Sequence, residues 1–132
     1  MQWKDDYLVN VREVDTQHKK LVSLVVELDA AMRQGKGRDA LGKILTSLVQ
    51  YTQYHFGTEE KLMAAKAYPA QPYHLEEHRK LTKTVVDFKT QFDKGSVAVT
   101  VQVMTFLEDW LVNHIHKTDK LLGRHLNSVG VT

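Results

Sequence analysis

The chain has 132 residues, the length of one domain, of which 42% are hydrophobic and 26% are charged, so it can bury a core and is not a disordered segment. It contains no cysteine, which excludes disulfides, thiolate nucleophiles and cysteine-ligated zinc or iron–sulfur centres. Its 18 basic and 16 acidic residues give a formal net charge of +2. Because these charges are spread along the whole length, they argue against nucleic-acid binding.

No stretch of the sequence is typical of a signal peptide or a membrane span. Residues 1–7 include two acids, and the apolar run from Leu21 to Val26 is interrupted by Ser23. We therefore expect a cytoplasmic protein with no membrane span. The unusual feature of the composition is its seven histidines, and any metal that they bind must be held by nitrogen and oxygen alone.

Glycine and proline divide the chain into an N-terminal leader and four long segments. The leader covers residues 1–14 and is expected to pack on a helical bundle formed by residues 15–132. The segments between the breaks are too long for strands, so they are predicted to be helices. The expected helices cover approximately residues 16–34, 38–65, 72–93 and 97–122.

Residues that favour helix starts lie near each of these boundaries. Asp15 or Thr16 can cap the first helix, Asp39 the second and Ser96 the fourth. Pro72 suits the opening turn of the third helix. These positions support the boundaries drawn from the glycine and proline breaks.

Apolar residues recur at steps of three and four in every predicted helix, as at Leu21, Val25 and Leu28 in the first. This spacing with short connections is typical of an all-α fold, an antiparallel up-down-up-down four-helix bundle. One segment has a different pattern, because the valines from Val97 to Val103 alternate with other residues as in a strand. Since they run without a break into helical spacing after Phe106, we interpret the whole segment as helix.

Polar residues interrupt the apolar stripe of every helix near one end of the bundle. His18 lies 17 residues before Gly35 and His55 lies 18 after Gly37, so both are about 26 Å from the same loop at 1.5 Å per residue. The same counting applies to the third and fourth helices. The residues expected at one level of the core are His18, His55, Glu59, His74, His78 and His114.

This coincidence favours a metal centre. A single histidine on an apolar stripe is most often a core residue with one hydrogen bond. A cluster of buried imidazoles with a carboxylate, however, costs several kcal/mol unless something binds it. Five histidines are too many for one structural zinc, and imidazole also suits copper, iron and nickel. Two metal ions bridged by carboxylates would use the whole set.

Asp119 is the candidate second carboxylate. It stands five residues after His114, where a regular helix would have rotated it by about 140°. The alternative is an aspartate in solvent. If Asp119 is a ligand, a local π-type irregularity between His114 and Asp119 is predicted, because such bulges recur at functional sites.

Four runs of sequence resemble the hemerythrin family, specifically its single-domain bacteriohemerythrins, and the resemblance covers nearly the whole chain, including Trp3 and Tyr7. The runs are residues 15–18, 55–63, 74–78 and 110–119. The resemblance implies two iron ions joined by a bridging oxo or hydroxo group. It assigns one iron to His74, His78 and His114 and the other to His18 and His55, with bridges from Glu59 and Asp119.

The resemblance also implies reversible dioxygen binding for transport, storage or delivery, without enzymatic activity. Dioxygen is the expected ligand, and an oxygen-consuming enzyme is a possible partner. Apolar residues beside the ligands match the family's oxygen pocket, although each on its own could equally be ordinary core packing. They are Leu21, Phe56, Trp110, Leu111 and Ile115.

Two other functions remain open from the sequence. One is a di-iron oxidase or peroxidase, but the helix stripes contain no Glu-x-x-His motif of the ferritin type. The other is oxygen or redox sensing in trans. His116 and His125 match no ligand position, and His116 is expected in solvent. Gly57 either permits a close approach near the metals or has no role.

Overall fold

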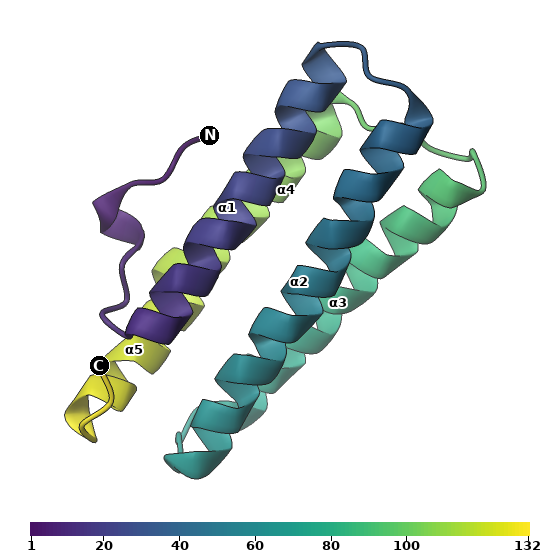
Figure 1. Ribbon diagram of the computed structural model, residues 1–132. Helices are drawn as coiled ribbons and strands as arrows, with labels where there is room; N and C mark the ends of the chain where they lie inside the picture. Colours follow the sequence, from purple (N-terminus) through teal and green to yellow (C-terminus); the bar gives the residue numbers. More distant parts are fainter.

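The computed structural model describes residues 1–132 and is entirely helical (Figure 1). Four long helices lie side by side in alternating directions, so the predicted all-α bundle is confirmed. Helix α1 packs on α2 and α4, and α2 packs on α3. The elements are a short 3₁₀ helix at Asp5–Tyr7, α1 at Arg12–Arg33, α2 at Arg38–Ala65, α3 at Gln71–Asp93, α4 at Val101–Asn113, the π-helical segment η2 at His114–Asp119, and α5 at Lys120–Ser128.

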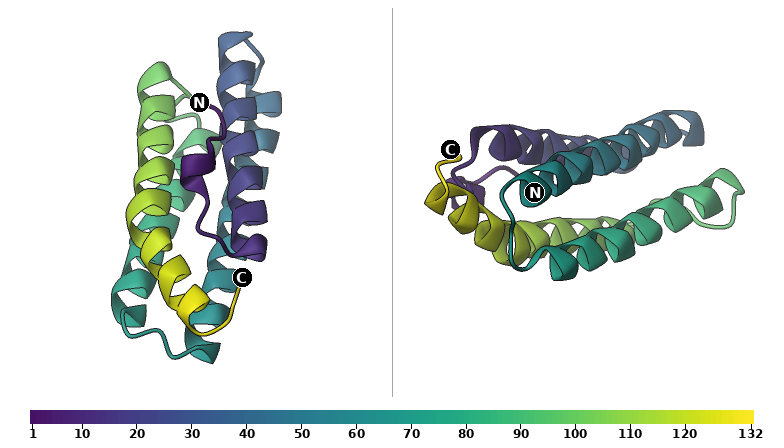
Figure 2. Two further views of the ribbon diagram at one scale, coloured as in Figure 1. Left: turned by 90° about the vertical axis from the view of Figure 1, so that its left-hand side faces the viewer. Right: turned by 90° about the horizontal axis from the view of Figure 1, so that it is seen from below.

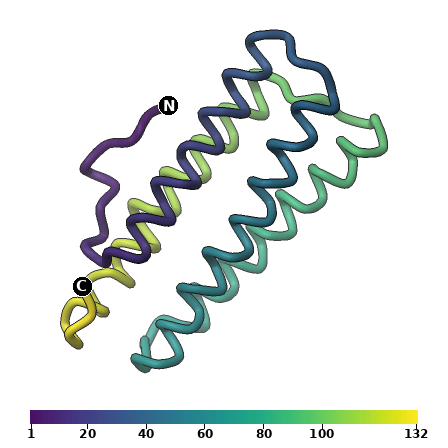
Figure 3. The backbone as a smooth tube through the Cα atoms, viewed as in Figure 1, coloured from purple at the N-terminus to yellow at the C-terminus, as the bar shows by residue number.

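The fourth helical segment differs from the sequence-based expectation at both ends. It begins at Val101 rather than at residue 97, and the side chain of Thr100, not Ser96, caps it by accepting a hydrogen bond from the Val103 N–H at 3.2 Å. Of the alternating valines, Val97 and Val99 lie before the helix, and Val101 and Val103 lie within it. At the other end the helix continues past residue 122 to Ser128. Figure 3 shows the trace running on from α4 into α5.

The start of the first helix and the caps expected for the first two helices are also corrected, whereas the second helix begins at Arg38 as expected. Helix α1 begins at Arg12, earlier than expected, and neither α1 nor α2 has a side-chain cap, so Asp39 does not cap α2. Asp15 lies within α1 and accepts hydrogen bonds from the backbone N–H groups of Val9, at 2.7 Å, and Asn10, at 3.1 Å. Its carboxylate thus fixes the leader instead of starting the helix. Pro72 does occupy the first turn of α3, as expected.

The leader runs along the bundle beside α1 (Figure 2, left). Tyr7, Val9 and Val11 are buried. The backbone oxygen of Val9 would lie 2.5 Å from a Cβ atom built on Gly123 of α5, so the close approach of leader and α5 requires glycine at that position.

Two apolar clusters fill the interior. The larger one contains 18 buried residues from the leader and the four long helices, and the smaller one joins the leader to α5 and includes Val14, Met63 and Leu122. In α1, α2 and the fourth helix, the buried polar residues lie along the chain between members of the larger cluster and members of the smaller one. The polar cluster is thereby enclosed by apolar side chains on both sides. None of the helices combines the length and the apolar composition that a membrane span requires.

Candidate metal centre

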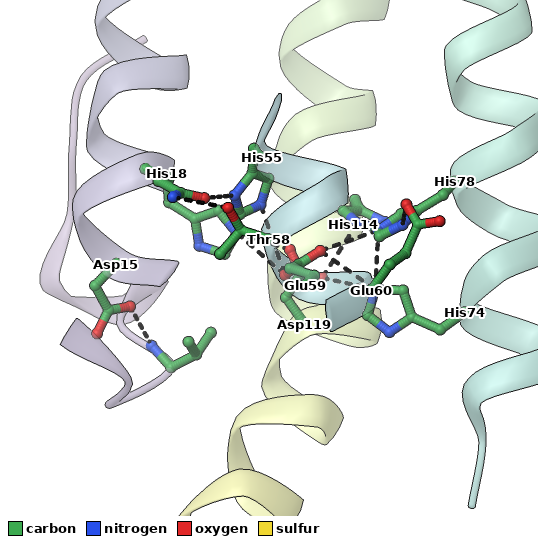
Figure 4. A network of polar contacts seen from close by, with 12 residues as sticks. Asp15, His18, His55, Thr58, Glu59, Glu60, His74, His78, His114 and Asp119 are labelled. Carbon is green, nitrogen blue, oxygen red and sulfur yellow. Dashed lines mark hydrogen bonds and ion pairs between the residues drawn. The ribbon is translucent and has the colours of Figure 1, made fainter. Parts of the chain in front are cut away.

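Seven polar side chains from all four long helical segments converge in the interior (Figure 4). Each is at most 4% exposed, and His18 and Glu59 are fully buried. Because α1 and α2 are antiparallel neighbours, the rings of His18 and His55 meet edge to face, with centroids 4.6 Å apart. The seven are His18 from α1, His55 and Glu59 from α2, His74 and His78 from α3, and His114 and Asp119 from η2.

The π-helical segment brings Asp119 to the cluster. Residues His114–Asp119 form one π-helical stretch, and the Lys120 N–H donates to the carbonyl of Ile115, five residues earlier. This winding returns the helix to the same face after five residues instead of four. As a result His114 Nε2 lies 3.1 Å from Asp119 Oδ1, and Asp119 is 1% exposed. The predicted irregularity is confirmed.

Each carboxylate presents one oxygen to each of two histidine groups. For Glu59, Oε1 lies 3.0 Å from His78 Nε2 and 3.4 Å from His74 Nε2, while Oε2 lies 3.6 Å from His55 Nε2. For Asp119, Oδ1 lies 3.3 Å from His74 Nε2, while Oδ2 lies 2.8 Å from His18 Nε2. The donor atoms therefore form two groups that share both carboxylates.

Each of the two groups could hold one metal ion. The first combines both carboxylates with His74, His78 and His114, and the second combines them with His18 and His55. Within each group the donor atoms lie within 4.8 Å of one another. The first group offers five donors and the second four. We call them the three-histidine end and the two-histidine end.

The cluster has the chemistry of a metal site rather than of a hydrogen-bond network. Buried polar atoms are almost always hydrogen-bonded, yet Nε2 of His18, His55 and His114 and both oxygens of Asp119 have no hydrogen-bond partner. Several of these atoms are close together but are not aligned for hydrogen bonds. Atoms that surround a common cation are arranged in this way, and an all-nitrogen-and-oxygen donor set suits zinc, copper, iron or nickel.

The pKa values of the cluster reflect its opposed charges. Burial is the main influence on His55 and lowers its pKa to about 4. Burial also opposes the charging of His74 and His114, but Asp119 and Glu59 outweigh it and raise the pKa of His74 to about 9 and that of His114 to about 10. Burial raises the pKa of the two carboxyl groups, and the surrounding histidines more than reverse this. Both carboxyl groups are therefore ionised at neutral pH and attract cations.

Three of the five outward-facing Nδ1 atoms have partners that the sequence analysis missed. His55 Nδ1 lies 2.7 Å from Gln17 Oε1, His78 Nδ1 lies 3.3 Å from Glu60 Oε2, and His114 Nδ1 lies 3.4 Å from Glu77 Oε1. Such contacts orient ligand imidazoles and leave Nε2 free to bind an ion. Their only sequence signal is adjacency, because Gln17, Glu60 and Glu77 each precede or follow a candidate ligand.

Of the five expected oxygen-pocket residues, two are aromatic and pack against the cluster. The ring of Phe56 stacks on His78 with centroids 3.8 Å apart, and Trp110 lies nearly parallel to His114 at 6.4 Å. Leu21, Leu111 and Ile115 are buried in the larger apolar cluster, whereas Trp110 is half-buried.

Three other residues discussed from the sequence lie outside the cluster. His116 is not in solvent as expected but half-buried against Tyr7 of the leader, with ring centroids 5.3 Å apart. His125 lies 2.8 Å from the carbonyl oxygen of Lys66. A Cβ atom on Gly57 would contact nothing within 4 Å, so no close approach requires glycine there.

The fold and the cluster together define a four-helix bundle with a buried site suited to metal ions. Comparison with known proteins identifies the family. The family description "Hemerythrin HHE cation binding domain" matches residues 9–126, and the chain belongs to the hemerythrin family.

Individual relatives cover almost the whole chain. A bacteriohemerythrin from Methylococcus capsulatus is 37% identical over 123 residues, which are 93% of each protein. One from Stenotrophomonas maltophilia is 30% identical over 129 residues, covering 95% of this chain and 83% of the relative. The crystal structure of a wild-type hemerythrin matches with a TM-score of 0.87 and 38% identity, covering 96% of this chain and 97% of that one.

Proposed function

We propose that this protein binds dioxygen reversibly at a di-iron centre held by the seven residues of the cluster. The observation that carries the proposal is the unequal division of donors between two ends that share both carboxylates, five at one and four at the other. When bound, two iron ions with an oxo or hydroxo bridge would supply the electrons that dioxygen takes up and returns. The shortage of one donor at the two-histidine end would leave room there for the gas.

The protein's own residues favour reversible binding over turnover. Leu21, Leu111 and Ile115 are each at most 2% exposed, and Phe56 covers the ring face of His78. These side chains exclude water, which would otherwise help a reduced oxygen species to leave. The cluster also offers five imidazole nitrogen donors for only two carboxylates. This is less anionic support for high-valent iron than the carboxylate-rich donor set of ferritin-type sites provides.

Metal analysis and optical spectroscopy test the proposal. The protein is loaded anaerobically with ferrous iron, exposed to air and then degassed. A carrier contains two irons per chain and shows a visible band that appears with oxygen and disappears on its removal. Such a carrier would supply an oxygen-consuming enzyme.

Two substitutions within η2 form a matched pair, one at a candidate ligand and one at a control residue. His114→Ala removes a candidate ligand, and His116→Ala removes a histidine that contacts Tyr7 instead. The first variant should lose iron and the band, and the second should keep both. Steady oxygen consumption with added reductant would instead indicate an oxidase, and binding of zinc alone would refute the di-iron proposal.

A further inference from the structure

The partners of the outward-facing imidazole nitrogens are distributed unequally between the two ends. At the three-histidine end, two Nδ1 atoms face carboxylates, those of Glu60 and Glu77, and the third, His74 Nδ1, has no hydrogen-bond partner. At the two-histidine end, His55 Nδ1 faces the neutral amide of Gln17, and His18 Nδ1 has no hydrogen-bond partner. Both outer carboxylates therefore contact the same end of the cluster.

Side chains around these groups hold them in place. The hydroxyl of Thr118 lies 3.1 Å from both carboxylate oxygens of Glu77, so Glu77 on α3 contacts two residues of η2 at once. At the opposite end Gln17 Nε2 donates to Thr58 Oγ1 at 3.1 Å. This bond fixes the amide so that its oxygen faces His55. Two of the three outer partners, Glu77 and Gln17, are thus held by further side-chain contacts.

A carboxylate behind an imidazole makes its Nε2 a stronger donor than a neutral amide does, because the negative charge polarises the ring and stabilises positive charge on the ion. Glu60 and Glu77 are partly exposed, with side chains 42% and 27% accessible. Solvent reduces this effect without removing it. Both carboxylates also add negative charge at the three-histidine end alone. This charge stabilises a trivalent cation more than a divalent one.

We propose that Glu60 and Glu77 are positioning residues that make the two metal positions unequal, so that the three-histidine end binds its ion more tightly and better stabilises a trivalent ion. This inference rests on the proposed di-iron function. It implies that a one-electron outer-sphere oxidant such as ferricyanide, itself reduced to ferrocyanide, removes the first electron from the iron at the three-histidine end.

Titration of the metal-free full-length protein with Co²⁺ against a competing chelator tests the first part. The wild type should bind two ions in two steps of unequal affinity. His18→Ala, which removes a donor of the two-histidine end, should keep the tighter step unchanged. Glu77→Gln and Glu60→Gln should each weaken the tighter step about 10- to 100-fold and leave the weaker step unaltered.

Glu76→Gln is the matched control. Glu76 is adjacent to Glu77 on α3 and pairs with Arg79 on the surface at 2.6 Å, so the variant loses the same charge on the same helix without touching a histidine. It should bind Co²⁺ as the wild type does. Thr118→Val, which keeps the carboxylate but removes the hydroxyl that anchors it, should weaken the tighter step by less than Glu77→Gln. Equal effects of Glu76→Gln and Glu77→Gln would overturn the inference.

The iron-loaded protein gives a second readout. Glu77→Gln should raise the first one-electron midpoint potential, by about 59 mV for each tenfold loss of preference for the trivalent ion, whereas Glu76→Gln should not. Two equal binding steps in the wild type would overturn this inference and leave the oxygen-carrier proposal intact. The opposite result is that Co²⁺ binds in two unequal steps and the variants behave as expected, but the iron-loaded protein binds no oxygen. That result would overturn the proposed function and leave this inference standing.

Discussion

Metal binding should expel protons from the cluster. The carboxylates that face His74 and His114 outweigh burial and raise the pKa of His74 to about 9 and that of His114 to about 10. Both residues are therefore protonated at pH 7 before an ion binds, but an imidazole ligand must be neutral. Burial lowers the pKa of His55 to about 4, so His55 is already neutral and has no proton to lose.

The expected magnitude follows from these values. At pH 7, loading both positions with divalent ions should release about two protons per chain from His74 and His114. Protons compete with ions, so the apparent affinity must rise with pH. Each proton displaced contributes about tenfold per pH unit, which gives about a hundredfold between pH 7 and pH 8 for the pair. This increase should fade as the pH passes 9 and then 10, where the two histidines lose their protons without metal.

Isothermal titration calorimetry measures the proton count directly. Co²⁺ is titrated into metal-free protein at pH 7 in three buffers with different ionisation enthalpies. The slope of the observed heat against the buffer's ionisation enthalpy is negative when protons are released, and its magnitude is the number released. A hydroxide bridge formed from water would add one more. His116→Ala, which lies outside the cluster, should give the wild-type slope. A slope near zero, or an affinity that does not change between pH 7 and pH 8, would refute the view that Glu59 and Asp119 keep these histidines charged.

Four further predictions concern water exclusion, the packing of α5 on the leader, helix propensity and the anchoring of the leader. Leu111→Asp should shorten the lifetime of the oxygenated protein severalfold by admitting water, whereas Leu111→Met should not, and the decay rate of the optical band measures this. Gly123→Ala should destabilise the protein by about 1–3 kcal/mol, since the new methyl group would overlap Val9. Gly57→Ala should stabilise it by about 0.5–1 kcal/mol, because the space there is open, and a lower urea midpoint for Gly57→Ala than for the wild type would contradict this. Asp15→Ala should cost about 1–3 kcal/mol in urea denaturation, because it leaves two leader N–H groups without their acceptor; an unchanged midpoint would show that water replaces the carboxylate.

Much of the fold was predictable because helical periodicity is a local property. Steps of three and four between apolar residues indicate which face of a helix is buried, and counting from a shared loop indicates which residues lie at one level. Even the π-helical segment could be anticipated, since the five-residue step from His114 to Asp119 is incompatible with a regular helix facing the cluster. The exact start of α4 could not, because the valines before Thr100 suit extended and helical backbone alike.

The sequence by itself determined the fold class, the family and the set of polar residues that meet in the core. Only the tertiary structure decided how their atoms divide into two groups, which carboxylate oxygen faces which histidine, and which outer residues contact the ligands. Glu77 and His114 are 37 positions apart, and no local spacing predicts that their side chains meet. Their contact depends on the rotation and vertical offset of α3 against η2, which the packing of the whole interior sets.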